Sequence, residues 1–209
     1  MRTRFLLVLC LFTPVAHTHA AAPDEFIDPT APEVATILKA GEAATGQVAM
    51  KLVGELTVAL SSGGPVSAID VCHLKAMPLT EEKLPTLPQV TAIKRTSLKL
   101  RNPVNAPDAA EQRALDRVAG ILAAGGEAPP FLVQKIPATT ESPAEWRVYR
   151  SVLVQQACVA CHGDPAKQSP ELRTILAARY PKDAATGYRT GDFRGLIRAT
   201  VASAPNPTN

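Results

Sequence analysis

Two cysteines and a histidine in the last third of the chain have types and spacing that could do chemistry. They stand in the stretch Ala157-Cys158-Val159-Ala160-Cys161-His162, which reads C-x-x-C-H. In this pattern each thiol can add to a vinyl group of a haem, and the histidine beside the second cysteine can bind the iron. The pattern therefore predicts one covalently attached haem c on Cys158 and Cys161, with His162 as an axial ligand.

The first 20 residues are typical of a secretory signal peptide. Residues 1 to 4 carry two arginines, residues 5 to 16 form an almost unbroken apolar run, and alanines follow at 20 to 22. Because this run is shorter than the roughly 20 residues that span a bilayer, we expect cleavage near Ala20 and a periplasmic protein without a later membrane span. Loss of Arg2 and Arg4 leaves 20 basic against 19 acidic residues, a balance that argues against nucleic-acid binding.

Two other chemistries also use a C-x-x-C pair. A thioredoxin-like dithiol would place the pair at the start of a helix in a βαβ unit, and the histidine would then be incidental. A structural zinc site needs four ligands, which Cys72 or His73 could help to complete. Haem is the preferred interpretation because an exported chain seldom carries the full C-x-x-C-H pattern by chance.

The second axial ligand of the iron stays open in the sequence. After loss of the signal peptide the cysteines are Cys72, Cys158 and Cys161, so at least one has no disulfide partner in an oxidising compartment. Iron coordination would protect the Cys72 thiol from oxidation. The residues alone support equally well a Cys72 that is buried and unreactive. Neighbours on a helix point about 100° apart, so only one of Cys72 and His73 can face a haem. The other candidates are Met50, expected in the core, Met77 and a lysine.

Basic and aromatic side chains could complete a haem pocket. Four cations could pair with the propionates or line the pocket, or could be solvated charges on strand faces: Arg95, Lys99, Arg101 and Arg194. Only 4% of the residues are aromatic. Three of them could pack on a haem, although aromatic residues in a sheet are more often ordinary core: Trp146, Tyr149 and Tyr188.

The elements that must position these residues are helical first and extended later. Capping-box patterns at Thr30 with Glu33 and at Asp108 with Glu111 predict two helix starts, and Gly63-Gly64-Pro65 should separate the first helix from a second that carries Cys72. The predicted helices cover residues 30 to 61, 65 to 78, 108 to 125 and 169 to 180. The predicted strands cover residues 90 to 100, 131 to 136, 146 to 154 and 193 to 201.

This order predicts an α+β fold with long N-terminal helices packed on an antiparallel sheet of four to five strands. Residues 30 to 203 should form a single c-type haem domain, because one haem motif in about 190 mature residues suits a single site and not a multihaem chain. We expect residues 21 to 29 to be a mobile leader and residues 204 to 209 a disordered tail.

Several segments together resemble a family of bacterial periplasmic c-type haem proteins with a PAS-like sensor fold, first described in cyanobacteria, in which a histidine and a cysteine hold the iron. The run Arg95-Thr96-Ser97-Leu98-Lys99-Leu100-Arg101-Asn102-Pro103-Val104-Asn105-Ala106-Pro107-Asp108 is far more specific than C-x-x-C-H alone. Residues 125 to 150 depart from the family, since they are shorter and richer in proline than expected. The other matching segments are 68 to 72, 158 to 163, 180 to 188 and 191 to 195.

The resemblance implies Cys72 and His162 as the axial pair. A thiolate ligand stabilises ferric iron, so we expect a low-potential redox or gas sensor, with a low-potential periplasmic electron-transfer cytochrome as the alternative. With both axial positions filled there is no open site for catalysis, so we do not expect an enzyme. On reduction the iron–thiolate bond should weaken and let CO or NO bind. A sensor of this kind needs a periplasmic redox or signalling partner.

Overall fold

The computed structural model describes residues 25 to 71, 87 to 140 and 142 to 202. Some predictions therefore lie outside the described residues: the signal peptide with its cleavage near Ala20, the candidate ligands Cys72, His73 and Met77, and the tail from 204 to 209. In chain order the main elements are β1 (Glu25–Ile27), α1 (Ala35–Asp70), β2 (Val90–Thr96), α3 (Ala109–Ala123), β3 (Phe131–Ile136), β4 (Glu145–Leu153), α4 (Val159–His162), α5 (Pro170–Arg179) and β5 (Phe193–Ala202).

The strands form one antiparallel sheet in the order β1-β3-β4-β5-β2. The predicted α+β fold is confirmed, and β3 has the predicted bounds. Residues 25 to 27, expected in a mobile leader, instead pair with β3, where Phe26 lies opposite Gln134. This short edge strand forms because Phe26 and Ile27 pack against the two sides of the core.

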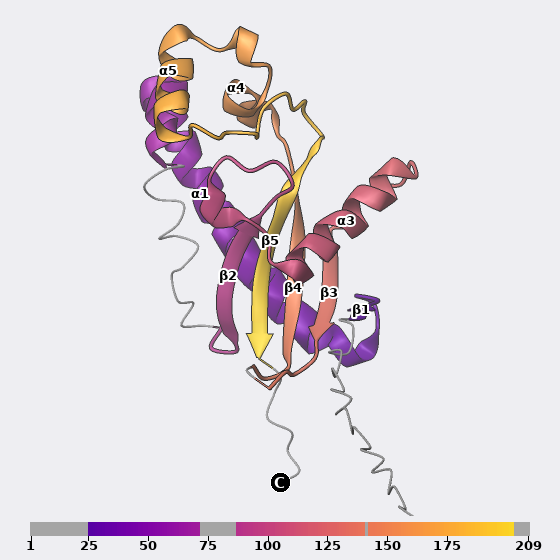
Figure 1. Cartoon of the computed structure of the whole chain (residues 1–209). Helices are drawn as coiled ribbons and strands as arrows, with labels where there is room; N and C mark the ends of the chain where they lie inside the picture. The colour runs from indigo at the N-terminus through magenta and orange to yellow at the C-terminus, as the bar shows by residue number, and fades with distance from the viewer. Residues whose placement is uncertain (1–24, 72–86, 141, 203–209) are drawn as a thin grey trace, which may run out of the picture.

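Helices cover both faces of the sheet, α1 on one face and α3 on the other (Figure 1). Neighbouring residues of β4 show the alternation, because Val148 packs with Val34 and Ala40 on the α1 side, while Tyr149 packs with Leu115 on the α3 side. Each of these five side chains is at most 4% exposed. The sheet is thus a central layer with a core on either face.

Helix α1 is longer than the sheet is tall, and its C-terminal part continues past the upper end of the sheet to meet α5 (Figure 1). The predicted break is present inside it, because Gly64 has φ 67° and ψ −165° and Pro65 follows without an N–H to donate. A left-handed φ of this kind suits glycine, which has no Cβ. The kink turns the last part of α1 back toward the end of the sheet.

One of the two predicted capping boxes is present and the other is absent. Asp108 and Glu111 form the full box at the start of α3, with both hydrogen bonds 2.8 Å long. The box at Thr30 and Glu33 is absent, because the Thr30 hydroxyl and amide both bond to Asp28 Oδ1 and a 3-10 turn at Pro32–Val34 leads into α1. Thr30 therefore takes part in an Asx turn with Asp28, and this turn replaces the capping hydrogen bond.

Met50 is 70% exposed, so the expectation that it fills the core was wrong. The core-facing residues of α1 include Ala44 and Val48, and a residue two positions after Val48 is rotated about 200° around the helix axis, onto the opposite side. Among the described residues, the helical stretch Pro32–Ile69 is long and apolar enough to cross a membrane by length and composition alone. Soluble core helices meet the same criterion, so the absence of a membrane span in the mature chain stays a prediction.

Gly41 lets α1 approach β4 closely, which generates a test of the fold. A Cβ added at Gly41 would lie 2.3 Å from Val148 Cβ, whereas one added at Gly54 in the same helix meets no atom within 4 Å. We expect Gly41→Ala to destabilise the protein by about 1–3 kcal/mol through overpacking. Gly54→Ala, the matched control, should stabilise it by about 0.5–1 kcal/mol because alanine favours helix. Urea unfolding measures both, and equal effects of the two substitutions would contradict this packing.

Candidate functional site

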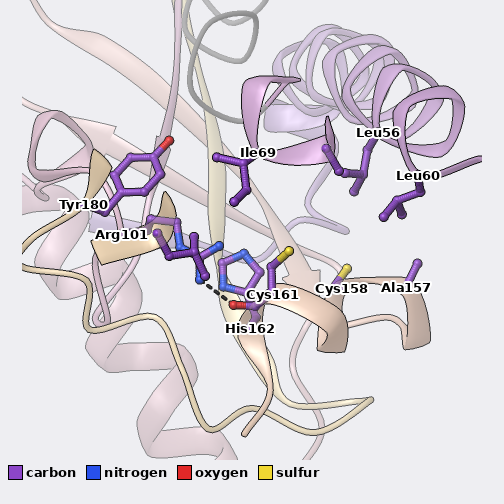
Figure 2. Close-up of a pocket in the computed structure, with 11 residues that line it drawn as sticks. Leu56, Leu60, Ile69, Arg101, Ala157, Cys158, Cys161, His162 and Tyr180 are labelled. Atoms are coloured by element: carbon purple, nitrogen blue, oxygen red, sulfur yellow. Dashed lines mark hydrogen bonds between the residues drawn. The ribbon is translucent and has the colours of Figure 1, made fainter. Parts of the chain in front are cut away.

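The C-x-x-C-H residues lie in a tight turn at the upper end of the sheet. After β4 ends, Gln156–Cys158 form a 3-10 turn and Val159–His162 form the single turn α4. Residues three apart on such a turn share one side, which brings the Cys158 and Cys161 side chains together. Gly163 ends the turn, where a Cβ would lie only 2.5 Å from the Val159 carbonyl oxygen. Figure 2 shows both thiols on the same side of α4.

The two thiols and His162 form one wall of an apolar pocket (Figure 2). The opposite wall comes from Leu56 and Leu60 of α1, and Ile69 closes the pocket from beyond the Gly64 kink. The other lining residues are Ala68, Arg101, Ala157, Leu176 and Tyr180. A flat hydrophobic cofactor attached to the thiols would find aliphatic side chains on its other side.

The imidazole of His162 is fixed by a backbone acceptor. Its Nδ1 lies 2.8 Å from the carbonyl oxygen of Ala185, and since a carbonyl can only accept, Nδ1 carries the proton. This tautomer leaves Nε2 with a free lone pair for a metal, and a carbonyl on the other ring nitrogen is the usual support for a metal-binding histidine. Burial, and then the charges of Arg101 and Arg194, lower the pKa of His162 to about 3. The ring is therefore neutral at physiological pH, as metal binding requires.

Arg101 lies against the base of this turn and is only 8% exposed. Its Nε donates to Asp183 Oδ2 at 2.9 Å, and its Nη2 donates to the carbonyl oxygen of Cys161 at 2.5 Å. Nε and Nη2 are thus engaged by protein acceptors. The predicted pairing of Arg101 with a haem propionate stays a prediction, and the structure places the side chain among the pocket-lining residues.

Lys99 and Arg194 hold Tyr188 next to His162. The Lys99 Nζ lies 4.6 Å from the centre of the Tyr188 ring and the Arg194 guanidinium carbon lies 5.4 Å from it, both within cation–π range. Tyr188 meets His162 edge to face at 6.3 Å between ring centres. Burial is the main cause that lowers the pKa of Arg194. These cations concentrate positive charge beside the histidine.

The other predicted pocket residues lie elsewhere. Arg95 is on β2, opposite Ile197, and does not line the pocket. Tyr149 is in the core under α3, where its hydroxyl donates to Gln134 at 2.6 Å, and Trp146 packs in the core on the α1 side. The interpretation of Tyr149 and Trp146 as ordinary core is confirmed, and of these three aromatic residues Tyr188 is the one that lies beside His162.

Of the two alternative chemistries, the structure bears on the thioredoxin-like dithiol. The C-x-x-C pair follows an antiparallel strand and sits in a single helical turn, which differs from the βαβ setting of a thioredoxin-like dithiol. Within the residues that the structure describes, there is no group of three or more metal-ligating side chains. Cys72 and His73, the ligands proposed to complete a zinc site, lie outside those residues.

Sequence analysis missed four residues that shape the site: Leu56 and Leu60 on the far wall, and Asp183 and Ala185 behind the histidine. The two leucines continue the apolar series of the first helix, so their burial was predictable but their role in a pocket was not. Asp183 was visible as a lone acid between Lys182 and two alanines in a segment already singled out by resemblance. Ala185 acts through its backbone, for which the side chain gives no signal.

Comparison with known proteins gives one family and one related structure. The model of the Tll0287-like family, described as Tll0287, matches residues 25–202. The crystal structure of the cyanobacterial haem-protein Tll0287 superposes with a TM-score of 0.57 and 20% sequence identity, covering 85% of this chain and 99% of that chain. At this identity the match shows a shared fold. No curated protein matches the chain.

The half-buried, neutral His162 predicts a specific pH dependence of the haem-free protein. The folded pKa of about 3 lies below the ordinary value of 6.5, so the unfolded state binds one proton more between these values. The contribution of His162 to the free energy of unfolding should be fully present above pH 6.5. It should decrease by up to about 1.4 kcal/mol for each unit by which the pH falls, until the folded pKa is reached. In His162→Gln this contribution should vanish. Urea unfolding at pH 4.5 and 7.5 compares the two proteins, and parallel losses of stability would contradict the prediction.

Proposed function

The chain belongs to the Tll0287-like family, and from this premise we propose that it is an exported protein that binds one haem c. Cys158 and Cys161 would hold the haem through thioether bonds, and His162 would be an axial ligand of the iron. The observation that carries this proposal is the shared wall of two thiols and a neutral imidazole, whose Nδ1 is held at 2.8 Å by the Ala185 carbonyl.

The second axial ligand in this proposal is Cys72. Ile69 lines the pocket, and three residues of chain reach at most about 11 Å, so the Cα of Cys72 is confined to that distance from the Cα of Ile69. Met50 is the sulfur-bearing candidate that lies within the described residues, and its 70% exposure places its side chain mostly in solvent. The covalent chain therefore supports Cys72 over Met50.

The apolar wall serves the proposed haem in two ways. Leu56, Leu60 and Ile69 keep water from the iron, which lowers the local dielectric and strengthens the influence of nearby charges. The bound haem would supply one-electron and diatomic-gas chemistry. The protein would supply a neutral imidazole, a thiolate and a dry pocket.

We propose a low-potential redox or gas sensor in the periplasm, and not an enzyme. A thiolate ligand favours ferric iron, and two protein ligands leave no coordination position for substrate. The resemblance to haem proteins with a PAS-like sensor fold supports sensing, which would require a periplasmic signalling or redox partner. A low-potential electron-transfer cytochrome is the second candidate, since Cys158 and Cys161 are partly exposed at the molecular surface.

Haem binding is tested by producing the full chain with its signal peptide in a host that has a haem-attachment system. The haemochrome spectrum of the denatured protein and its intact mass should show one covalent haem, lost when Cys158 and Cys161 are both replaced by serine. Low-spin thiolate-type EPR signals should be lost in Cys72→Ser, with Met50→Leu as the control that keeps them. A haem-free wild type would refute the proposal, and an unchanged Cys72→Ser spectrum would refute thiolate ligation.

Gas binding separates the sensor from the carrier. If the thiolate leaves on reduction, the ferrous optical spectrum should shift on addition of CO, whereas the ferric spectrum should not. An electron carrier keeps both axial ligands in both states, so its ferrous spectrum should be insensitive to CO. Cys72→Ser gives the comparison, because its ferrous form should bind CO at least as readily as the wild type.

A further inference from the structure

A chain of hydrogen bonds runs from Arg101 to the ring of His162. Arg101 Nε donates to Asp183 Oδ2 at 2.9 Å, and Asp183 Oδ1 accepts from the Ala185 amide at 2.8 Å. The carbonyl of the same residue, Ala185, accepts from His162 Nδ1 at 2.8 Å. One carboxylate thus joins a buried guanidinium to the residue that supports the imidazole.

The same guanidinium also grips the turn that carries the histidine. Arg101 Nη2 donates to the carbonyl oxygen of Cys161, the residue directly before His162, at 2.5 Å. Backbone hydrogen bonds join the loop that includes Asp183 and Ala185 to the chain beside Arg101 and to His162. The Ala184 amide donates to the Leu100 carbonyl, and the Tyr188 amide donates to the His162 carbonyl. Arg101 therefore fixes the backbone before the histidine and the acceptor beneath its ring, as Figure 2 shows for the bond to Cys161.

We propose that Arg101 and Asp183 are positioning residues that set the orientation and basicity of the His162 imidazole toward iron. This inference rests on the haem binding proposed above. A carbonyl acceptor on Nδ1 fixes the ring plane and raises the basicity of Nε2, and its effect depends on how firmly the carbonyl is held. Asp183 acts on this residue through the Ala185 amide, and Arg101 acts both through Asp183 and through its Nη2, which donates to the Ala185 carbonyl oxygen at 3.5 Å.

The chemistry of the pair suits this role better than a purely structural one. Asp183 is 11% exposed and Arg101 is 8% exposed, and a buried ion pair adds little net stability once its desolvation is counted. A planar guanidinium can reach two acceptors in fixed directions, Asp183 and the Cys161 carbonyl, whereas an ammonium is a point charge on a flexible stem. Geometry, and not charge alone, is what this arrangement requires.

The test uses variants that separate geometry from charge in the haem-loaded chain. Arg101→Lys keeps the charge and loses the fork, and Asp183→Asn keeps the shape and loses the carboxylate. The matched control is Arg147→Lys, because the Arg147 guanidinium likewise reaches two acceptors, the carboxylates of Glu145 at 2.6 Å and Asp108 at 2.7 Å, and does not line the pocket. Covalent haem content, ferric EPR spectrum and midpoint potential are measured for each.

Both site variants should retain one covalent haem, show a second low-spin ferric species or shifted g values, and have a higher midpoint potential, because a less firmly held acceptor lowers the basicity of the imidazole. Arg147→Lys should match the wild type in all three. Wild-type spectra and potentials in both site variants would overturn the inference while leaving haem binding intact. A wild type without haem would instead refute the proposed function.

Poor folding of the site variants does not remove the test. In the wild-type haem protein, the Nδ1 proton of His162 should exchange with deuterium slowly, because its acceptor is clamped by Asp183 and Arg101. Its paramagnetically shifted NMR signal reports the exchange. Persistence of the signal after transfer to deuterated buffer supports the inference, and loss within the mixing time overturns it.

Discussion

The hydrogen bond between His162 Nδ1 and the Ala185 carbonyl is the contact on which the rest of the site depends. It joins the short turn α4 to a loop that lies 23 residues further along the chain, so a local sequence motif cannot produce it. The loop is placed by β5, which starts at Phe193, and by backbone bonds such as that from Gly187 to the Gly163 carbonyl. The five-stranded sheet therefore acts as a rigid base for one imidazole.

Helix α1 links the core to the pocket because its two ends have different partners. Its first half is packed on the sheet, where Gly41 allows close contact with Val148. Its second half leaves the sheet and presents Leu56 and Leu60 to the thiols. The kink at Gly64 then returns Ile69 to the same pocket. A straight helix of this length would have carried Ile69 away from the site, so the unusual backbone at Gly64 is what closes the pocket.

Most of the elements could be predicted from the sequence, whereas the edge strand β1 and the contacts between elements could not. Strand β3, the cap of α3 and the break at Gly64 were predicted because each depends on neighbours in the chain, such as Asp108 with Glu111. Met50 was assigned to the wrong side of α1 because a nearly uniform apolar helix does not reveal which stripe faces the sheet. The partners of Arg101 lie 60 and 82 residues away in the chain, a separation that periodicity cannot bridge.

The charges around the site act in opposite directions on the proposed haem. Lys99, Arg101 and Arg194 bring three cations to the histidine side, and Asp183 pairs with one of them. Such cations favour reduced iron, whereas a thiolate from Cys72 favours oxidised iron. In the proposed ligand switch, loss of the thiolate on reduction would leave these cations balanced only in part by Asp183, which would stabilise the reduced, ligand-accessible state. A sensor requires two states that differ in iron ligation, here a ferric thiolate-bound form and a ferrous form open to ligand, whereas an electron carrier does not. The charge distribution thus supports the proposed sensor over the proposed electron carrier.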